Sequence, residues 1–234
     1  MREVEVENRA AEKDGSSFSR SLVSGSRIKI TLPAIDDKRK WLASGFGYVA
    51  FCLVYTFTGT APFRSATELS PSMIDDFIPF IDWTVWVYNA QFFFLLFCLM
   101  AVKKNVNISR ALYSMFAASL LSFLVFAVYP TSVPRIHLAG KGLTRTAFDF
   151  LYLIDSSANS FPSLHVSLAW LAAFSVCDEY GKKGLIALIG ALLITVSTMT
   201  TKQHYFIDVI AGLALMWLCR ALASKMNLKE VVRE

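Results

Sequence analysis

The segment KQHYFIDVIAGLALMWLCRALA, residues 202–223, opens with ionisable side chains and continues as a largely apolar stretch. A carboxylate at the centre of a spanning helix costs about 3 kcal/mol on insertion scales, so Asp208 needs a partner. On an α-helix, a residue four positions later lies one turn further along the same face. The spacing therefore predicts that His204 and Asp208 pair on one face of a membrane helix, near its start.

A second histidine stands at the start of another apolar stretch. It is His165, the last residue of the segment NSFPSLH at residues 159–165. The same ends of two predicted helices thus carry two histidines and an acid. That grouping favours a reaction site over a purely structural role.

The composition is typical of a multispanning membrane protein. Of the 234 residues, 55% are hydrophobic and 18% are charged. Six apolar stretches can be recognised, and five have roughly the 17 to 20 residues needed to cross about 30 Å of hydrocarbon. We therefore predict an all-α fold, a six-transmembrane-helix bundle. The predicted spans are residues 42–61, 83–102, 111–129, 163–176, 185–201 and 205–223.

The polar ends of the chain are predicted to be tails. Residues 1–40 are mixed in charge and rich in serine, without the apolar core of a signal peptide, and indicate a partly disordered cytosolic tail. Residues 41–224 are predicted to form the transmembrane catalytic bundle, and residues 225–234 a cytosolic C-terminal tail. The four cysteines lack metal or disulfide spacing and are interpreted as small buried hydrophobes. The sequence has no stripe of basic and aromatic residues of the kind that binds nucleic acid, so we expect no nucleic-acid partner.

The distribution of basic residues predicts the orientation of the bundle. Six spans put both tails on one side, and the loops of that side carry most of the basic residues. The positive-inside rule makes that side cytosolic. The candidate site then lies on the extracytoplasmic face, together with His137 in the long connection at residues 130–162. The basic residues that set this orientation are Lys38, Arg39, Lys40, Lys103, Lys104, Arg110, Lys182, Lys183, Lys225 and Lys229.

Cations accompany the histidines on the predicted outer side. Arg135, Lys141 and Arg145 lie in the long connection, and Lys202 directly precedes the last span. Cations beside imidazoles indicate an anionic substrate, most simply a phosphate. Ser163 belongs to a predicted helix start, whose free backbone N–H groups and dipole would favour the same anion.

The two histidines and the acid carry the functional groups that phosphoryl transfer needs. A neutral imidazole attacks phosphorus, and a carboxylate on its other nitrogen fixes the tautomer. His204 and Asp208 fit that pair, and His165 would protonate the leaving oxygen as a general acid. Metal binding by the same three side chains is the competing interpretation. Without a further ligand cluster in the sequence, we expect no metal and no other cofactor.

At these residues the chain resembles the type 2 phosphatidic acid phosphatase superfamily. The segment SFPSLH, residues 160–165, is similar to its second motif, and HYFID, residues 204–208, to the end of its third. The segments IPF (residues 78–80), which precedes Tyr88, and YPTSVPR (residues 129–135) are similar to those of the branch that contains inositol phosphorylceramide synthases and sphingomyelin synthases. The resemblance extends over about residues 79–212.

This resemblance implies six helices and a phosphohistidine intermediate on His204. It also implies Asp208 as the orienting carboxylate, His165 as the acid for the leaving group, and no metal. The implied substrate is a lipid phosphate or phospholipid, with water or a lipid alcohol as the acceptor of the phosphoryl group.

Three motif positions depart from the superfamily pattern. Thr198 stands where an arginine is usual, Val128 where the first motif has a lysine, and Leu164 where a glycine is common. We therefore expect the phosphate to be bound by other groups, namely Arg135 and Lys202.

The prediction is a lipid phosphate phosphatase or a lipid head-group phosphotransferase, and two other classes stay open. A transporter would use the histidines and the acid as a proton or ion relay, although the sequence has neither an inverted repeat nor paired broken helices. A non-catalytic lipid-binding scaffold is compatible with the missing motif lysine and arginine.

Overall fold

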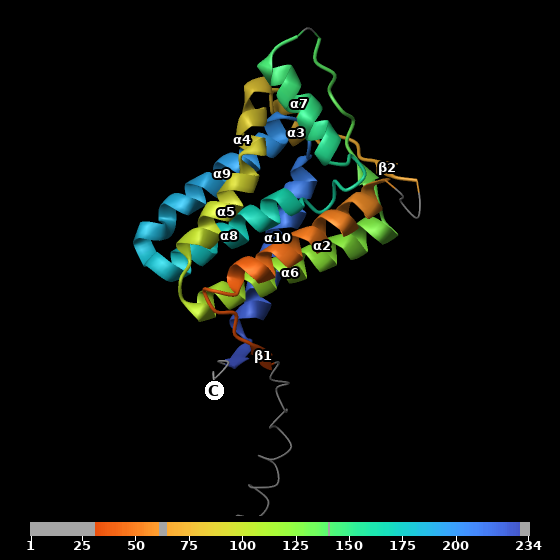
Figure 1. Ribbon diagram of the computed structural model, residues 1–234. Helices are drawn as coiled ribbons and strands as arrows, with labels where there is room; N and C mark the ends of the chain where they lie inside the picture. Colours follow the sequence, from red (N-terminus) through yellow and green to blue (C-terminus); the bar gives the residue numbers. More distant parts are fainter. Residues whose placement is uncertain (1–30, 61–64, 140, 230–234) are drawn as a thin grey trace, which may run out of the picture. The chain divides into compact units, whose positions relative to one another are not determined.

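Long apolar helices make up most of the computed structural model, which describes residues 31–60, 65–139 and 141–229 (Figure 1). The predicted helical class is confirmed. Five helical segments are long and apolar enough to cross a membrane. They are Lys40–Gly59, Asp82–Ala101, Asn105–Val128, Leu164–Thr200 and Phe206–Ser224.

The longest of these segments contains two helices rather than one. They are α8 (Leu164–Tyr180) and α9 (Leu185–Thr200), joined by the 3₁₀ turn η2 (Gly181–Gly184). Trp170 Nε1 donates a hydrogen bond to Thr195 Oγ1 at 2.9 Å, which joins the two helices far from the turn. The chain therefore reverses at η2, and α8 and α9 pack antiparallel.

Helix α8 forms the centre of the bundle. It contacts α5 (Gln91–Ala101), α6 (Asn105–Val128), α9 and α10 (Phe206–Ser224). Small residues let membrane helices approach closely, and the α8 residues Ala169, Ala172 and Ala173 are fully buried. A helix enclosed by four neighbours needs no apolar outer face. This explains why the predicted span, residues 163–176, is short. It ends four residues before the end of α8 at Tyr180.

The first two predicted spans correspond to α2 and to a helical run that is interrupted near its start. Helix α2 (Lys40–Thr60) packs along α6 (Figure 1). The second span consists of η1 (Asp82–Thr84), α4 (Val85–Asn89) and α5.

Short elements surround the end of the bundle where α8 and α10 begin. The predicted connection at residues 130–162 contains β3 (Thr131–Ser132) and an unpredicted helix, α7 (Leu143–Ile154), which packs on α4. Strand β3 pairs in parallel with β2 (Thr67–Glu68), and α3 (Met73–Phe77) follows β2. These elements frame the histidines.

Segments of both predicted tails meet at the opposite end. Strand β1 (Thr31–Pro33) pairs in parallel with β4 (Asn227–Lys229). Close by in the sequence, Lys40 is buried, and its Nζ donates to the carbonyl oxygens of Leu99 (2.9 Å) and Val102 (2.8 Å). The rest of the predicted tails, residues 1–30 and 230–234, lies outside the described residues.

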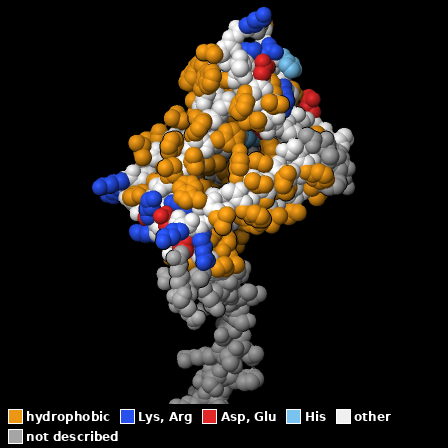
Figure 2. All heavy atoms as spheres, in the orientation of Figure 1, with side chains coloured by type: hydrophobic (Ala, Val, Ile, Leu, Met, Phe, Trp, Pro, Cys, Tyr) orange, Lys and Arg blue, Asp and Glu red, His pale blue; other side chains and the backbone are white. Residues whose placement is uncertain are grey.

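The lateral surface of the bundle is hydrophobic. Leu42 and Phe46 of α2, for example, are 77% and 79% exposed. Figure 2 shows hydrophobic side chains over the visible face of the helices, with lysine and arginine gathered toward its two ends. Apolar patches of this extent mark surfaces that another apolar phase covers. The surface and the five long segments are consistent with an integral membrane protein.

Candidate active site

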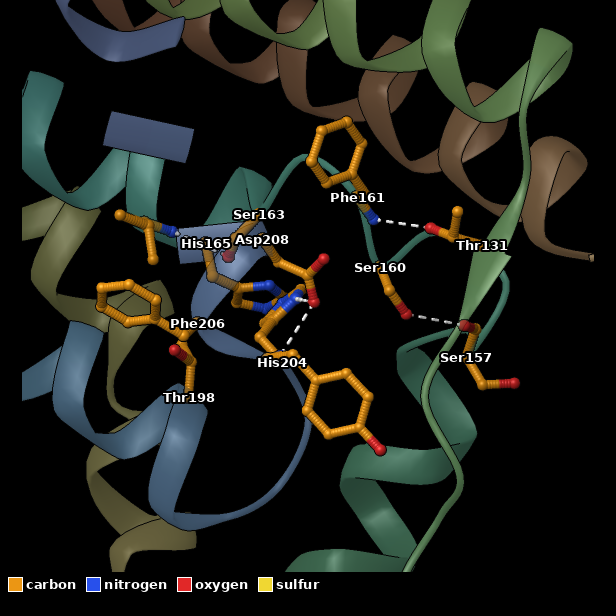
Figure 3. A network of polar contacts seen from close by, with 12 residues as sticks. Thr131, Ser157, Ser160, Phe161, Ser163, His165, Thr198, His204, Phe206 and Asp208 are labelled. Atoms are coloured by element: carbon orange, nitrogen blue, oxygen red, sulfur yellow. Dashed lines mark hydrogen bonds and ion pairs between the residues drawn. The ribbon is translucent and has the colours of Figure 1, made fainter. Parts of the chain in front are cut away.

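Two histidines from different elements lie side by side at one end of the bundle. His165 is the second residue of α8, and His204 lies in the turn between α9 and α10. Their ring centroids are 5.6 Å apart (Figure 3). The fold thus brings together two side chains that are 39 positions apart in the sequence.

His204 is paired with Asp208. The His204 Nδ1 atom lies 3.6 Å from Asp208 Oδ2, and both side chains are almost completely buried. Asp208 Oδ2 also accepts the Tyr205 backbone N–H at 2.9 Å. Because Asp208 lies in the first turn of α10, the positive end of the helix dipole further stabilises its charge. These contacts compensate a carboxylate that would otherwise be costly in this apolar surrounding.

The prediction that both residues lie on one helix was wrong. Helix α10 begins only at Phe206, so His204 precedes it. The reason is that Asp208 caps the helix by accepting the Tyr205 N–H, which fixes the start of α10 after His204. The backbone N–H of His204 instead donates to the carbonyl oxygen of Thr198 at 3.1 Å, which turns the ring back toward the acid.

Two polar atoms of this pair have no hydrogen-bond partner within the described part of the chain. They are His204 Nδ1 and Asp208 Oδ1, and both are buried. Buried polar atoms without partners are uncommon in native proteins and call for an explanation such as a catalytic role. A distance of 3.6 Å is longer than a hydrogen bond, and such contacts often tighten when substrate binds.

The start of α8 is packed directly against α10. The Ser163 backbone N–H donates to the Asp208 carbonyl oxygen at 3.0 Å, and Ser163 Oγ caps α8 by accepting the Val166 N–H at 3.4 Å. Gly212 makes this approach possible, because a Cβ there would lie 2.5 Å from the Ser163 carbonyl oxygen. His165 is therefore positioned relative to Asp208 through the backbone.

The segment before α8 is held by β3. Phe161 N donates to Thr131 Oγ1 at 3.0 Å (Figure 3), and Ser160 N donates to the Thr131 carbonyl oxygen at 3.2 Å. Two of the sequence segments that carry the family resemblance, residues 129–135 and 160–165, thus lie side by side.

A hydrogen-bonded network behind His165 was not predicted from the sequence. His165 Nδ1 lies 3.2 Å from the Tyr88 hydroxyl oxygen, and that hydroxyl donates to Asp155 Oδ2 at 2.6 Å. The Tyr55 hydroxyl donates to the other oxygen of Asp155. Asp155 Oδ2 is 3.9 Å from His165 Nε2, so each histidine has its own carboxylate.

The two predicted phosphate-binding cations are engaged with backbone carbonyls in this structure. Arg135 donates to the carbonyl oxygens of Tyr152 (3.2 Å) and Asp155, and its guanidinium stacks on the Tyr152 ring at 4.6 Å. Lys202 Nζ donates to the carbonyl oxygens of Asp75 (2.7 Å) and Ile78 (2.5 Å).

Helix α3 also caps the start of α10. Asp75 Oδ1 accepts the Phe206 backbone N–H at 2.7 Å. Burial by itself would raise the pKa of Asp75. Hydrogen bonds from Ser72 and Phe206, with the Lys202 ammonium nearby, outweigh burial and lower this pKa below its ordinary value. Asp75 therefore stays ionised and fixes the end of α10 that carries Asp208.

The remaining residues of the predicted outer cluster lie on the surface. His137 is exposed and meets the Tyr152 ring edge-on, with 6.5 Å between ring centroids. Arg145 pairs with Asp149 at 2.9 Å, one turn along α7, and Lys141 is exposed.

The residues at the three departing motif positions have structural contacts of their own. Thr198 is buried, and its carbonyl oxygen accepts the backbone N–H groups of Gln203 (3.0 Å) and His204 (3.1 Å). It thus supports the turn that carries the histidine. Leu164 packs in a hydrophobic cluster with Tyr55, and Val128 is exposed. Among the described residues, no group of three or more His, Cys, Asp or Glu side chains is arranged to hold a metal ion.

Comparison with known proteins identifies the family of the chain. The family model of the PAP2 superfamily matches residues 67–222. A PA-phosphatase related-family protein of Dictyostelium discoideum is 27% identical over 170 residues. That match covers 61% of this chain and 30% of the relative, so the chain spans less than a third of that relative's length. Because the family match covers more than half of the chain, including α8 and most of α10, the chain belongs to the PAP2 superfamily.

Proposed function

We propose that this protein is a membrane enzyme that transfers the phosphoryl-bearing head group of a lipid through a phosphohistidine on His204. The observation that carries the proposal is the arrangement of two imidazoles 5.6 Å apart, with Asp208 at the Nδ1 side of one of them. Membership of the PAP2 superfamily supports a reaction of the lipid-phosphatase type.

In the first step, the Nε2 lone pair of His204 attacks the phosphorus atom, and the bond from phosphorus to the leaving oxygen breaks. With the proton on Nδ1, the Asp208 carboxylate stabilises the positive charge that develops on the ring. His165, in its protonated form, gives its proton to the leaving oxygen. The products are a released alcohol and the phosphohistidine.

In the second step, an acceptor oxygen attacks the phosphohistidine and the N–P bond breaks. Neutral His165 takes the acceptor's proton, which restores the starting state of both histidines. Asp155, through its 3.9 Å approach and through Tyr88, offsets part of the cost of charge on this buried ring.

We further propose which groups hold the phosphoryl oxygens. Of the backbone N–H groups in the first turn of α8, that of Val166 is capped by Ser163 Oγ. Those of Leu164 and His165 have no partner within the helix and point toward its N-terminal end. Arg135 and Lys202 each keep N–H donors beyond the two used for carbonyl contacts, and Arg135 Nε is buried without a partner among the described residues.

The acceptor is proposed to be a lipid alcohol. The resemblance of residues 78–80 and 129–135 to the inositol phosphorylceramide and sphingomyelin synthase branch supports a transferase over a hydrolase. With water as the acceptor, the same site would act as a phosphatase.

The proposal is tested with purified protein in detergent and a panel of lipid phosphates and phospholipids, with diacylglycerol or ceramide added to half the samples. A new lipid that forms only with an acceptor supports the transferase, and free phosphate in both halves indicates a phosphatase. His204→Ala should lower turnover by about 1000-fold or more, while His137→Ala, the surface histidine, should keep it. Retained turnover in a folded His204→Ala protein would exclude His204 as the nucleophile.

The membrane topology is also a proposal. The parallel pairing of β1 with β4 supports an even number of crossings between them, because both strands then lie on one face. Counting α8 and α9 separately gives six, with the histidines on the extracytoplasmic face. In intact cells, an impermeant maleimide should label Lys141→Cys but not Lys103→Cys; both positions are exposed in the structure. The reverse pattern would invert the orientation.

A further inference from the structure

A cavity of about 410 Å³ lies at the end of the bundle opposite the histidines. It is formed between α6, α8 and α10, and it shares no lining residue with the candidate active site. Its polar lining consists of Asn107, Arg110, Ser114, Ser175, Asp178, Arg220 and Ser224. The cavity therefore combines two arginines with one acid and several neutral polar groups.

Arg110 supplies a cation without a partner. Its Nε atom is buried, and no ion pair or hydrogen bond joins its side chain to the rest of the described chain. Arg110 as a whole is partly exposed, but a guanidinium whose Nε is cut off from water and lacks a counter-charge is costly, and an anion in the cavity would complete it.

Arg220 is held in place by Asp178. Its Nη1 and Nη2 atoms donate to the two carboxylate oxygens at 2.8 and 2.7 Å, and the guanidinium stacks on Phe174 at 4.6 Å. A guanidinium has five N–H donors, so three are left for a ligand. Because Asp178 neutralises one arginine, the cavity has a net charge of about one positive unit, which suits an anion with one negative charge.

The position of the cavity along the helices points to a lipid. Arg110 is five residues after the start of α6, and Arg220 is four residues before the end of α10. At about 1.5 Å per residue, both lie less than about 8 Å from a helix end, which is the depth of lipid head groups. Trp217, which also lines the cavity, is 58% exposed, and exposed tryptophans are typical of the membrane boundary.

We propose that this cavity binds the head group of a phospholipid with a single negative charge and free hydroxyls, such as phosphatidylglycerol. The phosphodiester would contact Arg110 and Arg220, as in basic pockets between membrane helices that bind acidic head groups. The hydroxyls would contact Ser175, Ser224 or Asn107. A volume near the lower limit of ligand pockets, about 300 Å³, fits a head group whose acyl chains lie outside, along Trp217.

The test measures lipid affinity by native mass spectrometry of the full chain carrying His204→Ala, so that no lipid is consumed. Phosphatidylglycerol and phosphatidylcholine with the same acyl chains are compared. We expect about tenfold preference for phosphatidylglycerol, which corresponds to one charge-assisted contact, and loss of that preference in Arg110→Gln. Lys182→Gln removes an exposed charge at the same end of the bundle, outside the cavity, and should keep the preference.

Two outcomes overturn the proposal. One is an unchanged preference for phosphatidylglycerol in Arg110→Gln whose thermal unfolding without added lipid matches that of the parent. The other is displacement of phosphatidylglycerol by millimolar inorganic phosphate, which would identify a site for the free anion. Any lipid bound at the candidate active site is bound there in all variants, since all carry His204→Ala, and does not alter the comparison.

Discussion

At the scale of single residues, the site contains two imidazole–carboxylate pairs of different origin. His204 and Asp208 are close in the sequence, and their spacing signals the pair. Asp155 is ten residues before His165, and Tyr88 is further away, so only the fold brings them together. No periodicity or motif spacing distinguishes Asp155 from Asp149, the other acid of its loop, which is why sequence reasoning did not identify it.

Asp155→Asn is expected to lower kcat by about 10- to 100-fold, the range for residues that orient a catalytic group. The reason is that protonated His165 loses the carboxylate that offsets its charge. The deficit should shrink with a phosphate ester whose leaving group needs no proton, such as a nitrophenyl ester. Asp149→Asn, an exposed acid on α7, is the matched control and should have parental activity. An equal loss of kcat with both esters would show that His165 is not the general acid.

At the scale of elements, the contact between α8 and α10 sets the geometry of the site. Gly212→Ala places a methyl group 2.5 Å from the Ser163 carbonyl oxygen, which is backbone and cannot rotate away. We expect turnover to fall by about 100-fold, because a displacement near 1 Å is enough for that loss, and stability to fall by about 1–3 kcal/mol.

Gly45→Ala is the control for this substitution, since no atom lies within 4 Å of the position a Cβ would take there. Thermal unfolding and turnover are measured for both variants in the same detergent. Parental turnover in Gly212→Ala would show that the site tolerates separation of the two helix starts.

The cap from α3 predicts how acid affects stability. Since the folded-state pKa of Asp75 is lowered, its stabilising contribution is present above the unfolded value of about 3.9 and is lost as the pH falls through the folded value. Between about pH 5 and pH 3, the unfolding temperature of the parent should fall more steeply than that of Asp75→Asn. The exposed neighbour variant Asp76→Asn should follow the parent. Parallel curves for parent and Asp75→Asn would show that the cap contributes nothing.

Elements were predictable from sequence where one rule dominates and not where several compete. The apolar stretches gave the long helices, because burial in lipid requires length and hydrophobicity only. Helix α7 was not predicted, because charged side chains such as Arg145 and Asp149 break its apolar pattern and it is too short to span. The sequence placed His204 on the same helix as Asp208, whereas α10 begins at Phe206, because the choice of Asp208 as a cap depends on side-chain geometry.

At the scale of the whole molecule, the pairing of β1 with β4 joins the segment before the first long helix to the segment after the last. Leu32 and Leu228 are register partners. Cysteines at both positions, in a chain lacking the native cysteines, should form a disulfide on mild oxidation, since paired strands bring Cα atoms within the usual range of about 4.4–6.8 Å. Leu32→Cys combined with Thr67→Cys, which lies in β2, is the control. Absence of the first cross-link would contradict the pairing.

This strand pairing also imposes an order on biosynthesis. Strand β1 is translated before the first long helix and β4 after the last, so the two strands can pair into a ribbon only after the whole bundle has been translated. On the proposed topology, a chain with one helix left out of the membrane would hold the two strands on opposite faces of the bilayer, where neither finds its partner. The unpaired strand edges would then be open to the chaperones and proteases that survey unfinished membrane proteins, so closure of the ribbon would act as a structural proofreading step for insertion.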